Sequence, residues 1–182
     1  MVEDTEKDNL VVGGVRLHVA NTKTELPMVQ AVGKVDPRVY SEIDKLMING
    51  TAEIAGIWNS RAVMGMGLGA IYLMRSVIAI GSQIGIETIL SFASKATLQR
   101  GYDKGFEPFT SIGDNGEFNY PKMNMIATAV ICRNHINMPL ATDFEKNEIN
   151  KLRNLLEFKT NERWPRGEFE LAYQLRLNTV LV

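Results

Sequence analysis

The sequence is short of cysteine, of histidine and of net charge, and each shortage excludes a class of protein. Cys132 is the single cysteine and cannot form an internal disulfide, so nothing in the chain requires an oxidising compartment. The 20 basic residues nearly balance the 21 acidic ones. The chain therefore lacks the overall basic field that holds nucleic acid non-specifically, although a local basic patch stays possible.

Catalytic and metal-binding side chains are also scarce. His18 and His135 are the only histidines. The spacing of Cys132 and His135 suits a nucleophile pair or half of a metal site, but a metal needs two more ligands. We interpret Cys132 as a buried structural residue. The sequence predicts neither a bound metal nor a cofactor, and it favours a protein that is not an enzyme.

Composition and length favour one domain. The 182 residues are 45% hydrophobic and 23% charged, which is ordinary for a globular protein. We expect a single domain over 1–182, with an N-terminal arm or hairpin over 1–34, a helical core over 35–160 and a C-terminal strand or arm over 161–182. The first ten residues are acidic and polar, unlike a secretory or transit leader. We therefore expect a cytoplasmic protein, or a virion location for a coat protein.

One segment, from Arg61 to Glu87, carries a single internal charge, Arg75. A membrane span is disfavoured, because an arginine near its middle costs roughly 2.5–3.5 kcal/mol on insertion scales. The glycines formally match a degenerate dinucleotide fingerprint, Gly65-x-Gly67-x-x-Ala70. That fingerprint needs a strand immediately before it, and we expect a helical region there. A buried, closely packed helical segment is the interpretation that remains.

The two arginines of this segment need anionic partners. Arg61 and Arg75 are fourteen residues apart, so a single helix would place them on one face to within roughly 40°. An unpaired buried guanidinium is very costly. Glu53 and Glu87 are the internal candidates for pairing, and an external phosphate is the alternative, because the planar guanidinium fork suits it.

Loop aromatics beside basic residues indicate a second kind of nucleic-acid contact, in which bases stack and cations meet phosphates. Such pairs are also common as anchors of loops over a core. One group is Tyr102, Lys104, Phe106 and Phe109, and another surrounds Trp164. The complete predicted nucleic-acid-binding set is Arg61, Arg75, Arg100, Arg163, Trp164 and Arg166.

Hydrophobic periodicity and capping signals predict mostly helices. Asp36-Pro37 begins one helix that ends near Gly50, Thr51 caps another, and Ser82 caps a third. Thr142 to Glu145 fits a capping box and predicts a helix over about 143–158. Gly13-Gly14 marks an N-terminal hairpin, and alternation after Glu168 predicts a long C-terminal strand. The fold class we expect is mainly α (α+β), a compact core of four to six helices with short antiparallel strands.

These features lead to a functional hypothesis without motif support. The chain is expected to be a non-enzymatic, self-assembling protein that coats or scaffolds nucleic acid, as a nucleocapsid, capsid or filament subunit does. Its partners are then other copies of itself, joined through the extended ends, and RNA or DNA bound through phosphates, with no membrane. Two alternatives stay open. One is a small α+β enzyme or ligand-binding domain that uses Arg75 as an anion anchor, and the other is a protein-interaction module.

Overall fold

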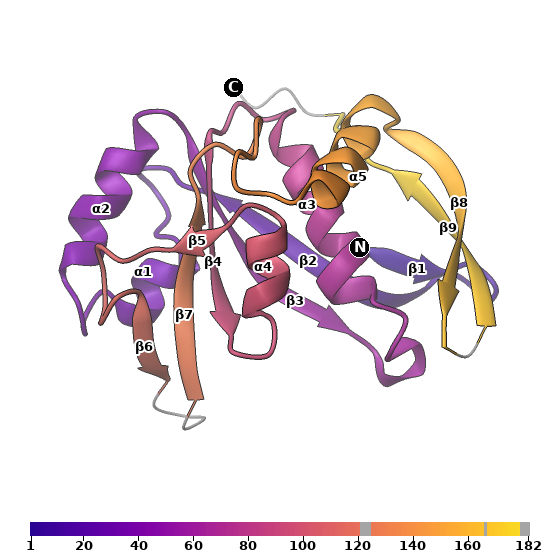
Figure 1. Cartoon of the computed structure of the whole chain (residues 1–182), viewed down its shortest axis with the longest axis horizontal. Coiled ribbons are helices and arrows are strands. Elements are labelled where there is room, and N and C mark those ends of the chain that lie inside the picture. The colour runs from indigo at the N-terminus through magenta and orange to yellow at the C-terminus, as the bar shows by residue number, and fades with distance from the viewer. Residues whose placement is uncertain (121–124, 166, 179–182) are drawn as a thin grey trace.

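A mixed seven-stranded sheet forms the centre of the protein. The computed structural model describes residues 1–120, 125–165 and 167–178. The strands lie in the order β1-β2-β3-β4-β7, with β5 and β6 both paired to the outer edge of β7 (Figure 1). Their bounds are β1 (Val2–Asp4), β2 (Leu10–Val19), β3 (Thr51–Asn59), β4 (Thr88–Ser94), β5 (Glu107–Pro108), β6 (Glu117–Tyr120) and β7 (Met125–Cys132).

Helices cover both faces of this sheet. One hydrophobic cluster joins the first two helices to Leu90 and Ile131, and another joins the third and fifth helices to the adjacent residues Ile89 and Val130. Since neighbouring residues of a strand point to opposite faces, the sheet is buried on both sides. The helices are α1 (Pro27–Val32), α2 (Arg38–Met47), α3 (Met74–Gly81), α4 (Leu98–Asp103) and α5 (Asp143–Asn154), with a 3-10 turn over Arg61–Val63 and a π-helical turn over Leu68–Leu73 before α3.

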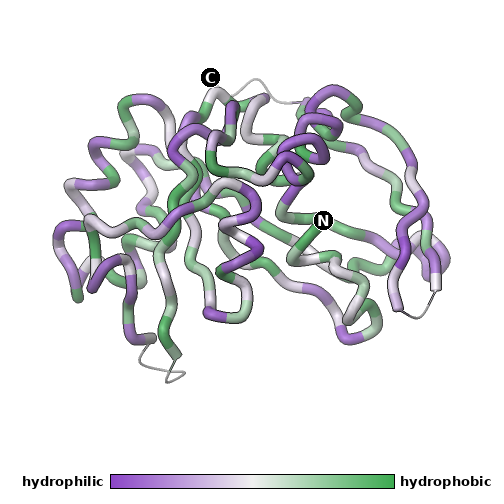
Figure 2. Tube along the Cα trace, viewed as in Figure 1, coloured by the Kyte–Doolittle hydropathy of each residue, from purple (hydrophilic) through white to green (hydrophobic). Residues whose placement is uncertain are grey.

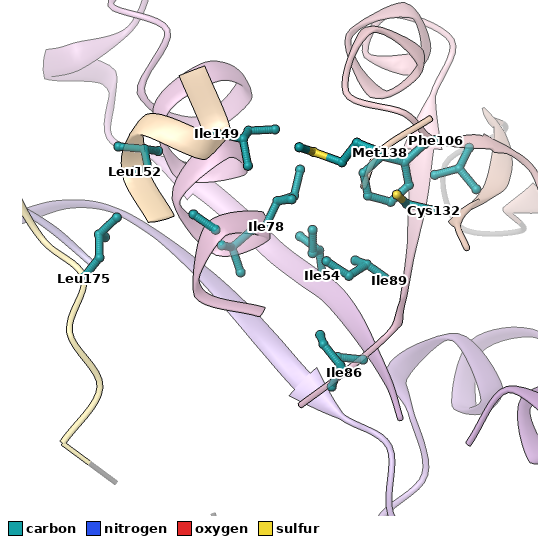
Figure 3. Close-up of a cluster of buried hydrophobic side chains, with 14 of the residues drawn as sticks. Ile54, Ile78, Ile86, Ile89, Phe106, Cys132, Met138, Ile149, Leu152 and Leu175 are labelled. Carbon is teal, nitrogen blue, oxygen red and sulfur yellow. The ribbon is translucent and has the colours of Figure 1, made fainter. Parts of the chain in front are cut away.

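The larger core cluster lies between the sheet and α3 and α5. Figure 3 shows Ile78 of α3 and Ile149 of α5 close to Ile54 and Ile89 of the sheet. All four side chains are almost completely buried. Figure 2 shows that β7, next to this cluster, is mostly hydrophobic along its length. Burial of this kind stabilises a fold by about 25 cal/mol per Å² of apolar surface removed from water.

A second, two-stranded sheet follows α5. It is the antiparallel hairpin of β8 (Glu157–Trp164) and β9 (Gly167–Gln174), which lies at the right of Figure 1 beyond β1. Its inner side chains, among them Phe169 and Leu171, pack against Tyr72. The Tyr72 hydroxyl also donates a hydrogen bond to Glu162, at 2.9 Å.

The expectation of a mainly helical core is wrong. Two segments that we expected to be helices, from Thr51 and from Ser82, contain the central strands β3 and β4. The first four residues of each strand are buried on both faces, so these segments lack the alternation of polar and apolar residues that identifies a strand. The expected hairpin at Gly13-Gly14 is also wrong, because both glycines lie inside β2, which has a register irregularity between Gly14 and Arg16.

Two helices lie where the sequence predicts them, and the predicted C-terminal strand is present but shorter than expected, since β9 ends at Gln174. Helix α5 begins at Asp143, and the Thr142 hydroxyl accepts a hydrogen bond from the Glu145 backbone N–H at 3.3 Å. Helix α2 occupies the expected place after Asp36. Strand β9 pairs with β8 of the same chain, while residues 179–182 lie outside the described residues. No helix of the described ranges is long and apolar enough to cross a membrane.

A buried ion pair joins α3 to α5. The Arg75 Nε and Nη2 atoms donate to Glu145 at 2.8 and 3.0 Å, and Lys104 Nζ lies 3.3 Å from the same carboxylate. Arg75 is 7% exposed and Glu145 is 8% exposed. Burial alone raises the pKa of Glu145, but the bonds from Arg75 and the charge of Lys104 outweigh it and hold that pKa below its usual range.

We predict that Glu145→Ala lowers the free energy of unfolding by about 3–5 kcal/mol, because it leaves two buried cations without their carboxylate. Glu148→Ala is the matched control, since its carboxylate also meets Arg75, at 3.5 Å, but is 36% exposed. That control should cost less than about 1 kcal/mol. Urea denaturation at pH 7 measures both, and equal losses in the two variants would contradict the prediction.

Candidate functional site

A cleft opens where the two parallel strands of the sheet separate. Strands β3 and β4 pair only from Thr51–Thr88 to Ile54–Ser91. Beyond those pairs, β3 continues beside β2 and β4 continues beside β7. The resulting cavity has a volume of about 640 Å³. Its walls are mostly apolar, which suits a small-molecule site.

The cleft passes through the sheet, because its walls come from both faces. On one face the walls include Pro27 and Ala31, which belong to α1. On the other face they include Ala70 of the π-helical turn, Met74 of α3 and Gly101 of α4. The residues that line the cleft therefore come from both sides of the gap between β3 and β4.

Glu53 is the buried titratable group of this cleft. Its side chain comes from the centre of β3 and is 3% exposed. The Met28 backbone N–H, in the first turn of α1, donates to Glu53 Oε2 at 2.7 Å. Such an N–H has no carbonyl partner within its own helix, so the carboxylate satisfies it. Burial raises the pKa of Glu53 to about 7, against the lowering effects of that hydrogen bond and of the Arg16 charge.

A pKa near 7 lets Glu53 accept and release a proton at neutral pH. This is the property that a general base needs, because its charged form must be present and yet bind a proton well. Perturbed carboxyl groups inside clefts are candidates for chemical function for the same reason.

The glycine-rich segment brings the backbone close to the cleft. Gly65 and Gly67 have φ angles of 92° and 76°, in the left-handed region that glycine adopts without strain. The chain then enters the π-helical turn at Leu68, and the cleft walls include Gly69 and Ala70. The N–H groups at the start of a helix lack helical partners and attract anions.

Gly69 must be small for the backbone to come this close. A Cβ atom at that position would lie 3.1 Å from Asn59 Oδ1 and 3.3 Å from Ile57 Cγ2. Strand β3, the glycines and the π-helical turn thus follow in this order along the chain. The expectation of a helical region before the glycines is wrong, because β3 lies there.

The predicted nucleic-acid-binding residues are not gathered in one place. Arg100 of α4 lines the cleft and is exposed. Arg61 lies in the exposed 3-10 turn that follows β3. Arg163 forms an exposed ion pair with Glu168 on the β8–β9 hairpin, at 2.8 Å, and Trp164 is the next residue of that strand. Arg166 lies outside the described residues.

The expectation about the partners of Arg75 is wrong. Its partner is Glu145, whereas the Glu53 carboxylate binds the Met28 N–H. Arg61 and Arg75 also lie in separate helical segments, so they share no helical face. Arg75 is therefore not available as an anion anchor, because its guanidinium is occupied by carboxylates.

Cys132 and His135 are buried structural groups. Burial raises the pKa of the Cys132 thiol to about 11, so it is not a thiolate at neutral pH. His135 is fully buried, with Nδ1 3.1 Å from the backbone oxygen of Glu87, and burial lowers its pKa. Neither residue is among those that line the cleft. The described residues include no group of three or more His, Cys, Asp or Glu side chains that could hold a metal ion.

Sequence reasoning missed the roles of Glu53 and Arg16. It treated Glu53 only as a possible partner of an arginine, and it gave Arg16 no functional role. A usable signal was present, because Glu53 interrupts an otherwise small and apolar run, Thr51 to Ile57. An acidic side chain in the buried part of a strand is rare and is therefore a candidate for a functional role. This signal can be used only after the segment has been recognised as a strand.

No model of a known protein family matches the sequence, and no curated protein matches it either. Solved structures do resemble it. The structure of FeeM, an N-acyl amino acid synthase from uncultured soil microbes, matches with a TM-score of 0.55 and 15% identity, over 75% of this chain and 73% of FeeM.

Two further solved structures match less closely. The CoA-dependent acyl-homoserine lactone synthase MesI has a TM-score of 0.49 and 14% identity, over 81% of this chain and 65% of MesI. A putative arylalkylamine N-acetyltransferase 7 from the yellow fever mosquito has a TM-score of 0.48 and 16% identity, over 70% of this chain and 61% of that protein.

These findings correct the functional hypothesis. The interpretation as a nucleic-acid coat, capsid or nucleocapsid subunit is wrong. The chain has a mixed seven-stranded sheet in place of the expected helical core, and its fold resembles that of FeeM, an N-acyl amino acid synthase. The alternative of a small α+β enzyme agrees better. At 15% identity the similarity to FeeM shows the fold, and the mixed seven-stranded sheet with its helices matches the GNAT acetyltransferase fold.

Proposed function

We propose that this chain is an N-acyltransferase, which moves an acyl group from a thioester to an amine. The observation that carries the proposal is the buried carboxyl of Glu53, whose pKa of about 7 suits a general base, inside a cleft that opens on both faces of the sheet. FeeM, which shares the fold, is by its name a synthase of N-acyl amino acids.

The acceptor enters on the α1 face, where Glu53 lies. The nitrogen of the amine attacks the carbonyl carbon of the thioester, a C–N bond forms, and the C–S bond breaks. The attacking amine gives up one proton, which Glu53 accepts and passes to solvent, while the leaving thiolate takes a proton from solvent. A positioned base of this kind contributes about 10²–10⁴-fold to a rate.

The donor enters on the opposite face. There Gly69 and Ala70, near the start of the π-helical turn, line the cleft together with Arg100 of α4. Helix N-termini and a guanidinium group both bind phosphate. The donor is therefore a thioester on a phosphate-bearing carrier, and acyl-coenzyme A thioesters are the probe of choice.

The proposal is tested by incubating the full chain with acyl-coenzyme A thioesters of two to sixteen carbons and a panel of primary amines. We expect release of free thiol that depends on the amine, together with an N-acyl product of the corresponding mass. Thiol release at the same rate without amine, or no amide with any pair, overturns the proposal.

We predict that kcat/KM, expressed per concentration of unprotonated amine, rises about tenfold per pH unit below pH 7 and levels off above it, because Glu53 must be deprotonated to accept a proton. Glu53→Gln keeps the shape of the side chain and should lower kcat/KM by about 10²–10⁴-fold. Glu117→Gln, an exposed position on β6, is the control and should keep the wild-type profile. A Glu53→Gln enzyme with the wild-type rate would exclude Glu53 as the base.

Stability provides a separate test of the same carboxyl. Burial raises the pKa of Glu53 from its usual 4.5 to about 7, so the folded state binds more protons than the unfolded state between these values. The free energy of unfolding of the wild type therefore falls over that pH range, by up to about 3 kcal/mol. Glu53→Gln has no such proton, so its stability relative to wild type should increase from pH 5 to pH 8 in urea denaturation. A constant difference would show that the pKa of Glu53 is not raised.

A further inference from the structure

Arg16 lies beside Glu53 on the acceptor face of the cleft. In the pairing of β2 with β3, Arg16 is opposite Ala55, two residues along the strand from Glu53. Residues two apart on a strand point to the same face. Arg16 and Glu53 both line the cleft, and the Arg16 charge acts on the Glu53 carboxyl.

The guanidinium of Arg16 is available to a ligand. Among the described residues it makes no hydrogen bond or ion pair, and the residue is exposed at the mouth of the cleft. Three charged residues line the cleft, namely Arg16, Glu53 and Arg100. Arg100 lies on the opposite, donor face, so Arg16 is the cation that an acceptor meets as it approaches Glu53.

We propose that the acceptor is an amine that also carries a carboxylate, as an amino acid does, and that Arg16 binds this carboxylate while Glu53 receives the proton of the amine. The inference rests on the proposed acyl transfer and names the class of its acceptor. The guanidinium fork matches a carboxylate with two parallel hydrogen bonds.

The spacing of the two side chains suits such a ligand. Arg16 and Glu53 are diagonal neighbours on adjacent antiparallel strands, a separation of roughly 7–8 Å, and the long arginine side chain can extend its charged end along the cleft. The amine and the carboxylate of an amino acid are only a few ångströms apart. One small molecule can therefore contact both groups at once, with its side chain directed along the apolar wall of Pro27 and Ala31.

A merely electrostatic role of Arg16 predicts something different. If Arg16 acts only by favouring the charged form of Glu53, its loss raises the pKa seen in the pH–rate profile and slows every acceptor alike. If Arg16 binds a carboxylate, its loss raises KM for acceptors that carry one and changes kcat little.

The experiment compares amino acids with the corresponding amino acid amides as acceptors, using the acyl-coenzyme A that gives the highest rate. We expect the wild type to favour the acid over the amide by about 10–100-fold in kcat/KM, the value of a charge-assisted hydrogen bond. Arg16→Gln should remove this preference through a higher KM for the acid, and Arg16→Lys should restore part of it. Arg163→Gln, on the distant hairpin, is the matched control and should keep the preference.

Equilibrium binding separates the failure of this inference from the failure of the proposed function. Calorimetric titration of the full chain with the same amino acids and amides needs no acyl donor. Acyl transfer to amines with no preference for the acid, or a preference that survives in Arg16→Gln, overturns the role of Arg16 and leaves the acyltransferase intact. Amino acid binding that is lost in Arg16→Gln, without acyl transfer from any donor, supports the binding site and overturns the reaction. Circular dichroism establishes that each variant is folded.

Discussion

The short length of the parallel pairing between β3 and β4 decides the rest of the architecture. The two strands are side by side for only four residue pairs, and the last of these is Ile54–Ser91. At that point the Ser91 hydroxyl donates to the Ile54 carbonyl at 3.0 Å. Soon after, Gly56 takes a left-handed φ of 62°, which changes the direction of β3. Each strand then stays with its antiparallel neighbour, and the sheet divides into two halves.

This division leaves the free strand edges along a cleft. The unpaired edges of β3 and β4 face a cleft that admits a ligand, and each strand keeps its other edge in the sheet. A buried carboxyl is tolerated in the same place because one end of α1 supplies an N–H donor to Glu53. Its ionisation still costs stability, since burial disfavours the charged form. That cost is typical of groups kept for chemistry rather than for folding.

Local signals in the sequence were sufficient for some elements and insufficient for the site. Helix α5 has a capping threonine and helix α2 an aspartate before its first turn, and both were predicted because such signals act within a few residues. The first four residues of β3 and of β4 are buried on both faces, so they lack the alternation that identifies a strand. The candidate site depends on register between distant segments. Nothing local in the sequence indicates that Arg16, Glu53 and Arg100 line one cleft.

The buried ion pair between α3 and α5 contributes to the site through rigidity. Helix α3 continues directly from the π-helical turn, whose residues Gly69 and Ala70 line the cleft. Arg75 lies in the first turn of α3, and its two bonds to Glu145 fix that turn against α5. Donors that are held in place before a ligand arrives need no reorganisation during the reaction, which is the main way in which fixed dipoles accelerate a transfer. In the proposed acyl transfer, the arginine that the sequence marked as an anion anchor would therefore act indirectly, because it holds in position the backbone that lines the cleft.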